Sequence, residues 1–178
     1  MMSSKRNSLR HLVLAAVCLA LALVLPFLTG QIPQIGKQLC PMHIPVLLCG
    51  FFCGPWYALA VGAIAPLLRF ALFGAPPIVP IGIAMCFELA TYGITAGLFY
   101  QWLPKKKRYV YASLLGAMLA GRLIWGAAQV VLWNLGKTEF GFAAFLSGAF
   151  VTAIPGIILQ LVLIPLVVMA LDKYTNRR

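Results

Sequence analysis

Long apolar stretches with almost no charged side chains run through this sequence and leave few folds open to it. A helix needs about 20 apolar residues to cross the hydrocarbon layer of a bilayer. Within lipid a helix satisfies its own backbone polar groups, which a single strand cannot do. The sequence therefore predicts an all-α membrane protein, one domain over 1–178, with six transmembrane helices at 9–28, 44–53, 56–73, 78–103, 109–135 and 145–171.

The second of these helices is expected to be short. The apolar run 44–73 is too long for one ordinary span, and Gly54-Pro55 interrupts it. A proline cannot continue a preceding helix without removing a backbone hydrogen bond. We therefore divide the run into a short helix, 44–53, and a longer one, 56–73.

The composition excludes the main soluble classes of protein. Of the 178 residues, 62% are hydrophobic and 10% are charged, and the mean hydropathy is +0.96. A soluble domain carries about 25% charged residues, which keep it in water. A water-soluble enzyme and a DNA-binding domain are both excluded on this ground.

The basic residues indicate how the chain is oriented. The sequence has 14 Lys and Arg against 3 Asp and Glu, a net charge of +11. In membrane proteins Lys and Arg gather in short cytoplasmic segments. With six crossings and both termini in the cytoplasm, two basic residues, Lys37 and Lys137, lie outside and ten lie inside: Lys5, Arg6, Arg10, Lys105, Lys106, Lys107, Arg108, Lys173, Arg177 and Arg178. The positive charge thus orients the protein and does not indicate nucleic acid as a partner.

Two charged side chains are expected near the middle of the bilayer. A charge in hydrocarbon is strongly unfavourable, so each one is a functional candidate that needs a partner. From the helical rise, Glu88 lies roughly 15 Å below the outer start of its span, and Arg122 lies roughly 20 Å above the inner start of its own. The sequence predicts a Glu88–Arg122 pair, which either locks two helices together or forms the floor of a polar cavity.

Polar and small residues at helical spacing accompany this pair on three predicted helices. Such spacing places them on one face of each helix. The three faces are Glu88, Thr91, Tyr92 and Thr95; Arg122, Trp125, Gln129 and Trp133; and Gly148, Thr152, Gly156 and Gln160. A cavity with aromatic walls and a few directed polar groups is the usual form of a small-molecule site. The predicted substrate-binding residues are Arg69, Glu88, Tyr92, Arg122, Trp125, Gln129, Trp133, Asn134 and Thr152.

Arg69 and His43 each have two interpretations. Arg69 lies about one helical turn from the outer end of its span, where it either extends to the headgroups or offers its guanidinium to an anionic ligand. His43 begins the second helix and faces either the same site or water. The outer loop between the first two helices, 29–42, is long enough to cap a pocket.

The sequence contains no motif for catalysis or metal binding that we recognise. Ser147-Gly148 lacks the Gly-x-Ser-x-Gly context of a serine protease, and neither His-Glu-x-x-His nor a Walker A motif occurs. Cys49 and Cys53 share a helix face, but no His or carboxylate joins them at ligand spacing. We expect neither enzymatic activity, nor a cofactor, nor a bound metal.

Three local patterns show a resemblance to a known family. They are Ala16-x-x-x-Ala20 in the first span, His43-Ile44-Pro45-Val46, and Gly50-Phe51-Phe52-Cys53-Gly54-Pro55 running into Gly62. Together with the length, the six spans and the long first outer loop, they make the chain similar to the substrate-binding S components of energy-coupling factor (ECF) vitamin transporters. The resemblance covers essentially the whole chain.

The resemblance implies a multi-pass protein of a prokaryotic plasma membrane that binds a water-soluble vitamin from outside. It implies two kinds of partner, a transmembrane coupling subunit and two cytoplasmic ATPase subunits that supply the ATP hydrolysis. Docking on the coupling subunit is implied for the small-residue face of Ala16 and Ala20. A small-residue face suits this role because it lets another helix approach closely.

The ligand that the resemblance favours is pantothenate, with pyridoxine, hydroxymethylpyrimidine and riboflavin as alternatives. Riboflavin-type members commonly have an acidic residue near the start of the second helix, where this chain has His43. Arg69 or Arg122 would bind the carboxylate of pantothenate, and Glu88 would accept hydrogen bonds from its hydroxyls. Two other classes remain open: a structural membrane protein without a ligand, and a secondary transporter that needs no ATPase.

Overall fold

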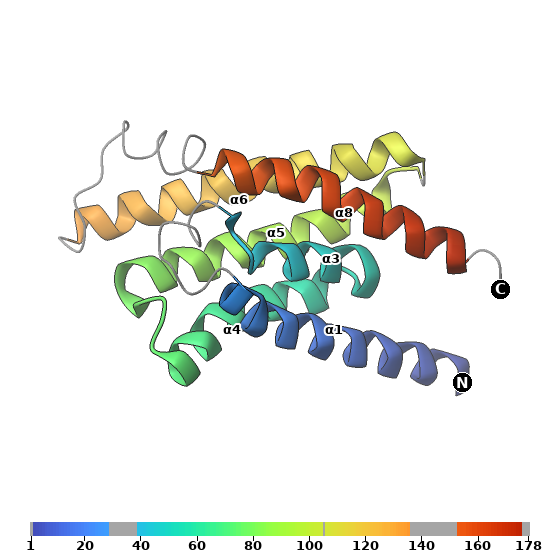
Figure 1. Ribbon diagram of the computed structural model, residues 1–178, viewed down its shortest axis with the longest axis horizontal. Coiled ribbons are helices and arrows are strands. Elements are labelled where there is room, and N and C mark those ends of the chain that lie inside the picture. The colour runs from blue at the N-terminus through green and yellow to red at the C-terminus, as the bar shows by residue number, and fades with distance from the viewer. Residues whose placement is uncertain (1, 29–38, 105, 136–152, 176–178) are drawn as a thin grey trace.

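The computed structural model of the chain describes residues 2–28, 39–104, 106–135 and 153–175. Within these ranges the structure is helical and contains no strand. The elements are α1 (Met2–Leu28), α3 (His43–Cys53), α4 (Pro55–Phe73), the short turn η1 (Ile78–Gly82), α5 (Ile83–Trp102), α6 (Lys107–Asn134) and α8 (Ile154–Thr175). The start of α1 and the end of α8 lie at the same end of the bundle (Figure 1). The all-α membrane fold with a short second helix is confirmed.

The helices differ in whether their length spans a bilayer. In the described ranges α1, α4, α6, α8 and the segment from η1 through α5 are long and apolar enough to cross. α3 has 11 residues, so at 1.5 Å per residue it extends about 16 Å, roughly half of the hydrocarbon thickness. The predicted start of the last span, at residue 145, lies outside the described residues.

The predicted span 78–103 is not one continuous α-helix. Val79 has an extended backbone (φ −108°, ψ 128°), and regular α-helix begins at Ile83. The residue before a proline avoids the helical region for steric reasons, and Pro80 follows Val79. The predicted span is therefore confirmed at Ile78–Trp102, but its first turn is η1 and not regular α-helix.

α3 lies in the interior of the bundle. It packs against α1, α4, α5 and α8 (Figure 1), and all of its residues except Leu48 and Phe52 are buried. A helix that is apolar on every side is expected to be enclosed by other helices. Gly54 then turns the chain into α4 with a φ of 91°, which residues with a side chain rarely adopt. This burial carries His43, the first residue of α3, into the protein.

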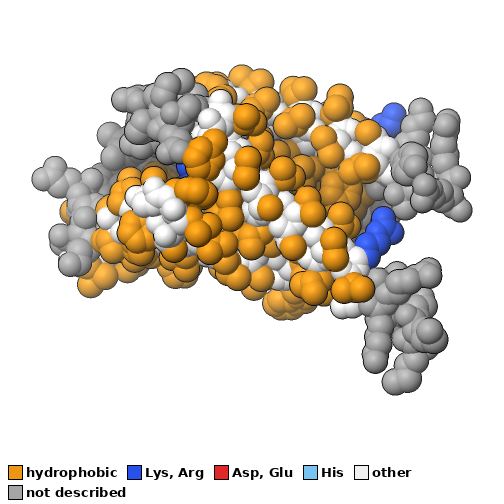
Figure 2. All heavy atoms as spheres, turned by 60° about the horizontal axis from the view of Figure 1, so that its bottom comes forward, with side chains coloured by type: hydrophobic (Ala, Val, Ile, Leu, Met, Phe, Trp, Pro, Cys, Tyr) orange, Lys and Arg blue, Asp and Glu red, His pale blue; other side chains and the backbone are white. Residues whose placement is uncertain are grey.

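The outer surface is mostly apolar, as expected of a protein that is surrounded by lipid. Figure 2 shows a face covered mostly by hydrophobic side chains, with most of the visible Lys and Arg side chains toward one end. Trp56 and Trp102 are 71% and 72% exposed, at the start of α4 and the end of α5. Tryptophan at the end of a span is typical of the membrane interface. The exposed Lys106, Lys107 and Arg108 follow Trp102 closely, as the predicted orientation requires at a cytoplasmic end.

Two glycines let α4 and α5 pack backbone to backbone. A Cβ atom at Gly62 of α4 would collide with the Leu89 carbonyl of α5, and a Cβ atom at Gly93 of α5 would collide with the Ala58 carbonyl of α4. Small residues at helix crossings in membranes allow this approach. The crossing fixes the part of α5 that carries Glu88, directly before Leu89.

We expect Gly62→Ala to lower the melting temperature of the purified protein clearly, since the added methyl meets backbone that cannot rotate away. Overpacking of this kind costs about 2 kcal/mol. The matched control is Gly116→Ala, whose Cβ would meet only the ring of Phe99, a side chain that can shift. Thermal unfolding in one detergent compares the two variants; equal melting temperatures would contradict the close crossing.

Candidate functional site

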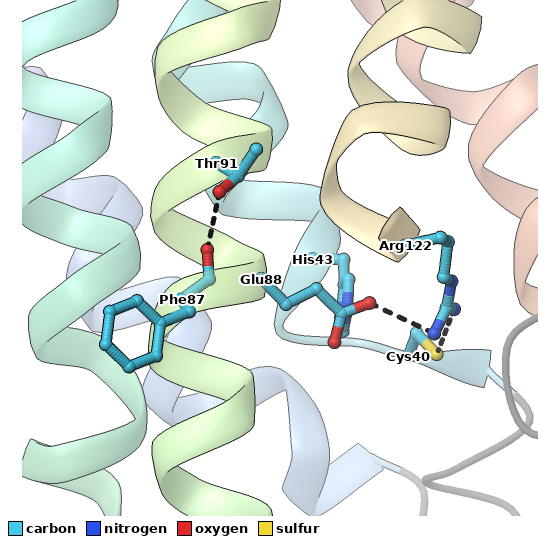
Figure 3. A network of polar contacts seen from close by, with 6 residues as sticks. All are labelled: Cys40, His43, Phe87, Glu88, Thr91 and Arg122. Carbon is cyan, nitrogen blue, oxygen red and sulfur yellow. Dashed lines mark hydrogen bonds and ion pairs between the residues drawn. The ribbon is translucent and has the colours of Figure 1, made fainter. Parts of the chain in front are cut away.

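Four side chains from three helices and the segment before α3 meet inside the bundle. One Glu88 oxygen, Oε1, lies 3.0 Å from Arg122 Nη1 and 3.4 Å from His43 Nε2. Arg122 Nη2 donates to Cys40 Sγ over 3.7 Å. Figure 3 shows Glu88 of α5 pointing between His43 of α3 and Arg122 of α6, with Cys40 beside the guanidinium. We call these four residues the polar cluster.

The backbone at the start of α3 and just before it brings His43 and Cys40 into the polar cluster. Cys40 has a φ of 47°, in the left-handed region that residues other than glycine seldom adopt. The His43 backbone N–H donates to the Cys40 carbonyl over 3.0 Å. This tight turn directs the Cys40 thiol toward Arg122 and starts α3 with His43 against α5.

Tyr92 supports the polar cluster from α5, one turn after Glu88. Its side chain is 1% exposed, and its ring packs edge-on to the His43 ring with centroids 5.1 Å apart. Its side chain lies close enough to the Glu88 carboxylate for the two to interact electrostatically. The ring fits against α6 because Gly121 has no Cβ there. Glu88 is therefore approached by Arg122, His43 and Tyr92.

The ionisable side chains of the polar cluster are buried inside the bundle. Glu88, His43 and Arg122 are 2%, 4% and 8% exposed. Isolated ions at such depth are strongly unfavourable, and a partner of opposite charge offsets much of this penalty. The predicted Glu88–Arg122 pair is present in the structure, at the contact distance given above.

Several buried polar atoms of this region have no aligned hydrogen bond within the described part of the chain. The large majority of buried side-chain polar atoms in native proteins have such a bond. The exceptions lie on four side chains, three of them in the polar cluster: His43 Nδ1 and Nε2, Glu88 Oε1, Arg122 Nε and Gln129 Oε1. Donors and acceptors are both present among them, so the region offers contacts to a polar molecule that carries both kinds of group.

The predicted residues of α6 divide into two groups. Gln129 is buried and Trp125 is half-buried, both on the side of α6 that carries Arg122. Trp133 is 50% exposed, and Asn134 is exposed with Nδ2 donating to the Val130 carbonyl of its own helix. The structure does not bring Trp133 or Asn134 to the polar cluster.

The two threonines predicted on the polar face of α5 bond to their own helix and not to the polar cluster. The hydroxyls of Thr91 and Thr95 bond to the carbonyls of Phe87 and Thr91 on their own helix, as Figure 3 shows for Thr91. Thr152 lies outside the described residues, and so does most of the loop 29–42. The cavity expected between the three faces stays a prediction.

Arg69 lies against α1 and not beside Glu88. Its Nη1 donates to the Leu23 carbonyl over 2.7 Å, and its guanidinium carbon lies 5.3 Å and 5.7 Å from the ring centres of Phe27 and Phe73. Its side chain is 5% exposed, between α1 and α4. A carbonyl and two aromatic faces are favourable partners for a guanidinium, and they join α1 to α4 here. The structure does not bring Arg69 to the other predicted ligand contacts.

The predicted docking face of α1 is exposed. Ala15, Cys18 and Ala22 of α1 are buried against the bundle, whereas Ala16 and Ala20 are exposed. No other described part of the chain covers the two exposed alanines. The face is thus available to a further helix.

The sequence left His43 with two interpretations, the site or water, and it gave Cys40 no role in the site. A signal for His43 was present, since it is the only ionisable residue besides cysteine in an otherwise apolar helix. Cys40 had no such signal, because its position depends on the turn between 39 and 42. The fold of this turn decides between the two interpretations of His43, which contacts Glu88, and it brings Cys40 to Arg122.

Comparison with known proteins identifies the family of the chain. The family model for the ECF transporter, substrate-specific component, matches residues 10–168. Neither the curated proteins nor the solved structures compared with the chain include a significant match. The matched range includes α3 to α6 entirely and therefore the whole polar cluster. By this match the chain belongs to the family of substrate-specific components of ECF transporters, which are substrate-binding transport subunits and not enzymes.

Proposed function

We propose that this protein binds pantothenate from outside the cell, as the substrate-binding subunit of an ECF-type ABC transporter. The observation that carries the proposal is the set of buried polar atoms without aligned hydrogen bonds on His43, Arg122 and Gln129, beside the Glu88 carboxylate that Arg122 contacts. A folded protein rarely leaves such atoms unbonded unless a partner takes them up. A small polar ligand is the partner that suits a substrate-specific component.

The chemistry of these atoms favours a ligand with a carboxylate and hydroxyl groups. The Arg122 Nε–H is a donor suited to a carboxylate oxygen, and Gln129 Oε1 is an acceptor suited to a hydroxyl. Arg122 and Gln129 are seven positions apart on α6, about 10 Å along the helix, so an elongated molecule reaches both. Pantothenate has a carboxylate at one end and hydroxyls at the other. Pyridoxine and hydroxymethylpyrimidine lack the carboxylate, and riboflavin presents a large ring system.

The proposed partners are a transmembrane coupling subunit and two cytoplasmic ATPase subunits in a prokaryotic plasma membrane. The exposed alanine face of α1 supports a helix–helix contact with the coupling subunit, because small residues let two helices approach closely. The ATPases would supply the energy, since this sequence has no Walker A motif. The basic end of the bundle supports a cytoplasmic position for both termini.

The test uses the purified protein in detergent or nanodiscs against a panel of water-soluble vitamins and precursors. We expect pantothenate to raise the melting temperature and to bind by calorimetry, and mass spectrometry of protein from its own host to find it bound. A shift with pyridoxine, hydroxymethylpyrimidine or riboflavin alone would replace pantothenate with that compound. If no compound of the panel binds, the polar cluster is a packing device and the proposal fails.

A further inference from the structure

We propose that His43 sets the charge of the ligand that the polar cluster accepts: as an imidazolium it lets a monoanionic carboxylate bind beside Glu88 and Arg122. The inference rests on the proposed function, because it concerns the ligand of the same site. It predicts that binding of a carboxylate takes up a proton and that binding of a neutral analogue does not.

Without a ligand, the Glu88–Arg122 pair of the polar cluster carries no net charge. Glu88 and Arg122 form an ion pair with 3.0 Å between Oε1 and Nη1, and both side chains are buried. Their formal charges cancel. A ligand carboxylate placed at Arg122 Nε therefore adds one negative charge to a neutral pair. A net charge is strongly unfavourable in a buried site, so anion binding needs one further positive charge nearby.

His43 is placed to supply that charge. Its Nε2 lies 3.4 Å from Glu88 Oε1, the same oxygen that contacts Arg122. Neither of its ring nitrogens has an aligned hydrogen bond within the described residues. Histidine is the side chain that ordinarily gains or loses its charge near neutral pH. A proton on Nε2 would face the Glu88 carboxylate, and Arg122 would then be shared with the ligand.

Among the residues that the structure describes, the other titratable groups around α3 do not take this role. Glu88 and Tyr92 of α5 face His43 directly, with Arg122 and Cys40 behind Glu88. Between Ile154 and Leu171, α8 has no titratable side chain. The titratable side chains in the described parts of α1 and α4 have other neighbours. Cys18 interacts with Cys49 and Cys53, and Arg69 contacts Leu23. Tyr57 contacts Ser8 and His11, and Arg10 lies next to His11 in the sequence.

The experiment measures proton uptake by calorimetry in buffers of different ionisation enthalpy, between pH 6 and 8. The probes are matched pairs of a carboxylate and its neutral analogue: pantothenate and panthenol, nicotinate and nicotinamide, biotin and biotinamide. A free carboxylate stays ionised throughout this pH range. We expect the carboxylate that binds to take up about one proton above neutral pH, so that its affinity falls about tenfold per pH unit there. The neutral partner should bind without a pH slope.

Two histidine variants locate the proton. The sequence has two His, so His43→Gln is compared with His11→Gln, whose ring packs against Tyr57 at the start of α4. Proton uptake should be lost in His43→Gln, with its melting temperature checked, and retained in His11→Gln. Carboxylate binding without proton uptake, or uptake that persists in His43→Gln, would overturn this inference and leave the transport proposal standing. Binding of neutral compounds alone would overturn this inference and replace pantothenate as the ligand, and the role as a substrate-binding subunit would stand. Binding of no compound at all would overturn both.

Discussion

We expect Arg122→Met to lower the stability of the ligand-free protein more than replacement of both Arg122 and Glu88 does. In the single variant Glu88 remains buried and loses the partner 3.0 Å from its oxygen, which costs about 3–5 kcal/mol. In the double variant, Arg122→Met with Glu88→Leu, neither charge remains. An apolar pair of similar volume is often neutral or stabilising in such a place. Unfolding of the three proteins in the same detergent measures the effect, with Glu88→Leu alone as the third.

The matched control is Arg69→Met combined with Glu88→Leu. Arg69 is also buried, but its partners are Leu23, Phe27 and Phe73. Its effect should therefore add to that of Glu88→Leu, because distant sites without shared partners are independent. Additive losses for the Arg122 and Glu88 pair as well would show that the contact carries no coupling energy. Every variant that changes Glu88 or Arg122 should bind the ligand poorly, whereas Arg69→Met alone, measured alongside them, should still bind it.

The spans and the central ion pair could be predicted because each depends on position along one helix. The apolar stretches give the helix ends to within a few residues for α6, predicted at 109–135 and found at Lys107–Asn134. Depth in the bilayer brings Glu88 and Arg122 to one level, because each residue advances a helix by 1.5 Å. The break at Gly54-Pro55 follows from backbone sterics alone.

Other predictions needed information that one helix does not contain. Helical spacing puts Trp133 on the face of Gln129, but it does not say which neighbour covers that face, and Trp133 is half exposed. Arg69 was expected to meet either a headgroup or an anion. The sequence did not indicate that Arg69 also donates to the carbonyl of Leu23, 46 positions away. The extended backbone before Pro80 is a different case. The sequence analysis did not predict it, although the steric rule for residues preceding proline applies there.

A bulky substitution on the exposed face of α1 should abolish transport and leave ligand affinity unchanged. Ala16→Trp with Ala20→Trp places two large side chains where close approach of a partner helix requires small ones. Both alanines are exposed, on the side of α1 away from buried Ala15 and Ala22, so the bundle itself need not rearrange. Uptake of the labelled vitamin by cells that contain the complete transporter measures transport, and calorimetry on the purified protein measures affinity.

Ala112→Trp distinguishes loss of docking from a general effect of two large side chains in the lipid-facing surface. Ala112 is an exposed alanine on α6, so a tryptophan there meets lipid just as those on α1 do. It should leave uptake intact. Loss of uptake in both variants would indicate a defect in insertion or stability and not in docking. Lost affinity in the α1 variant would mean that this face supports the ligand site, because a surface used only for docking does not contact the ligand in the isolated protein.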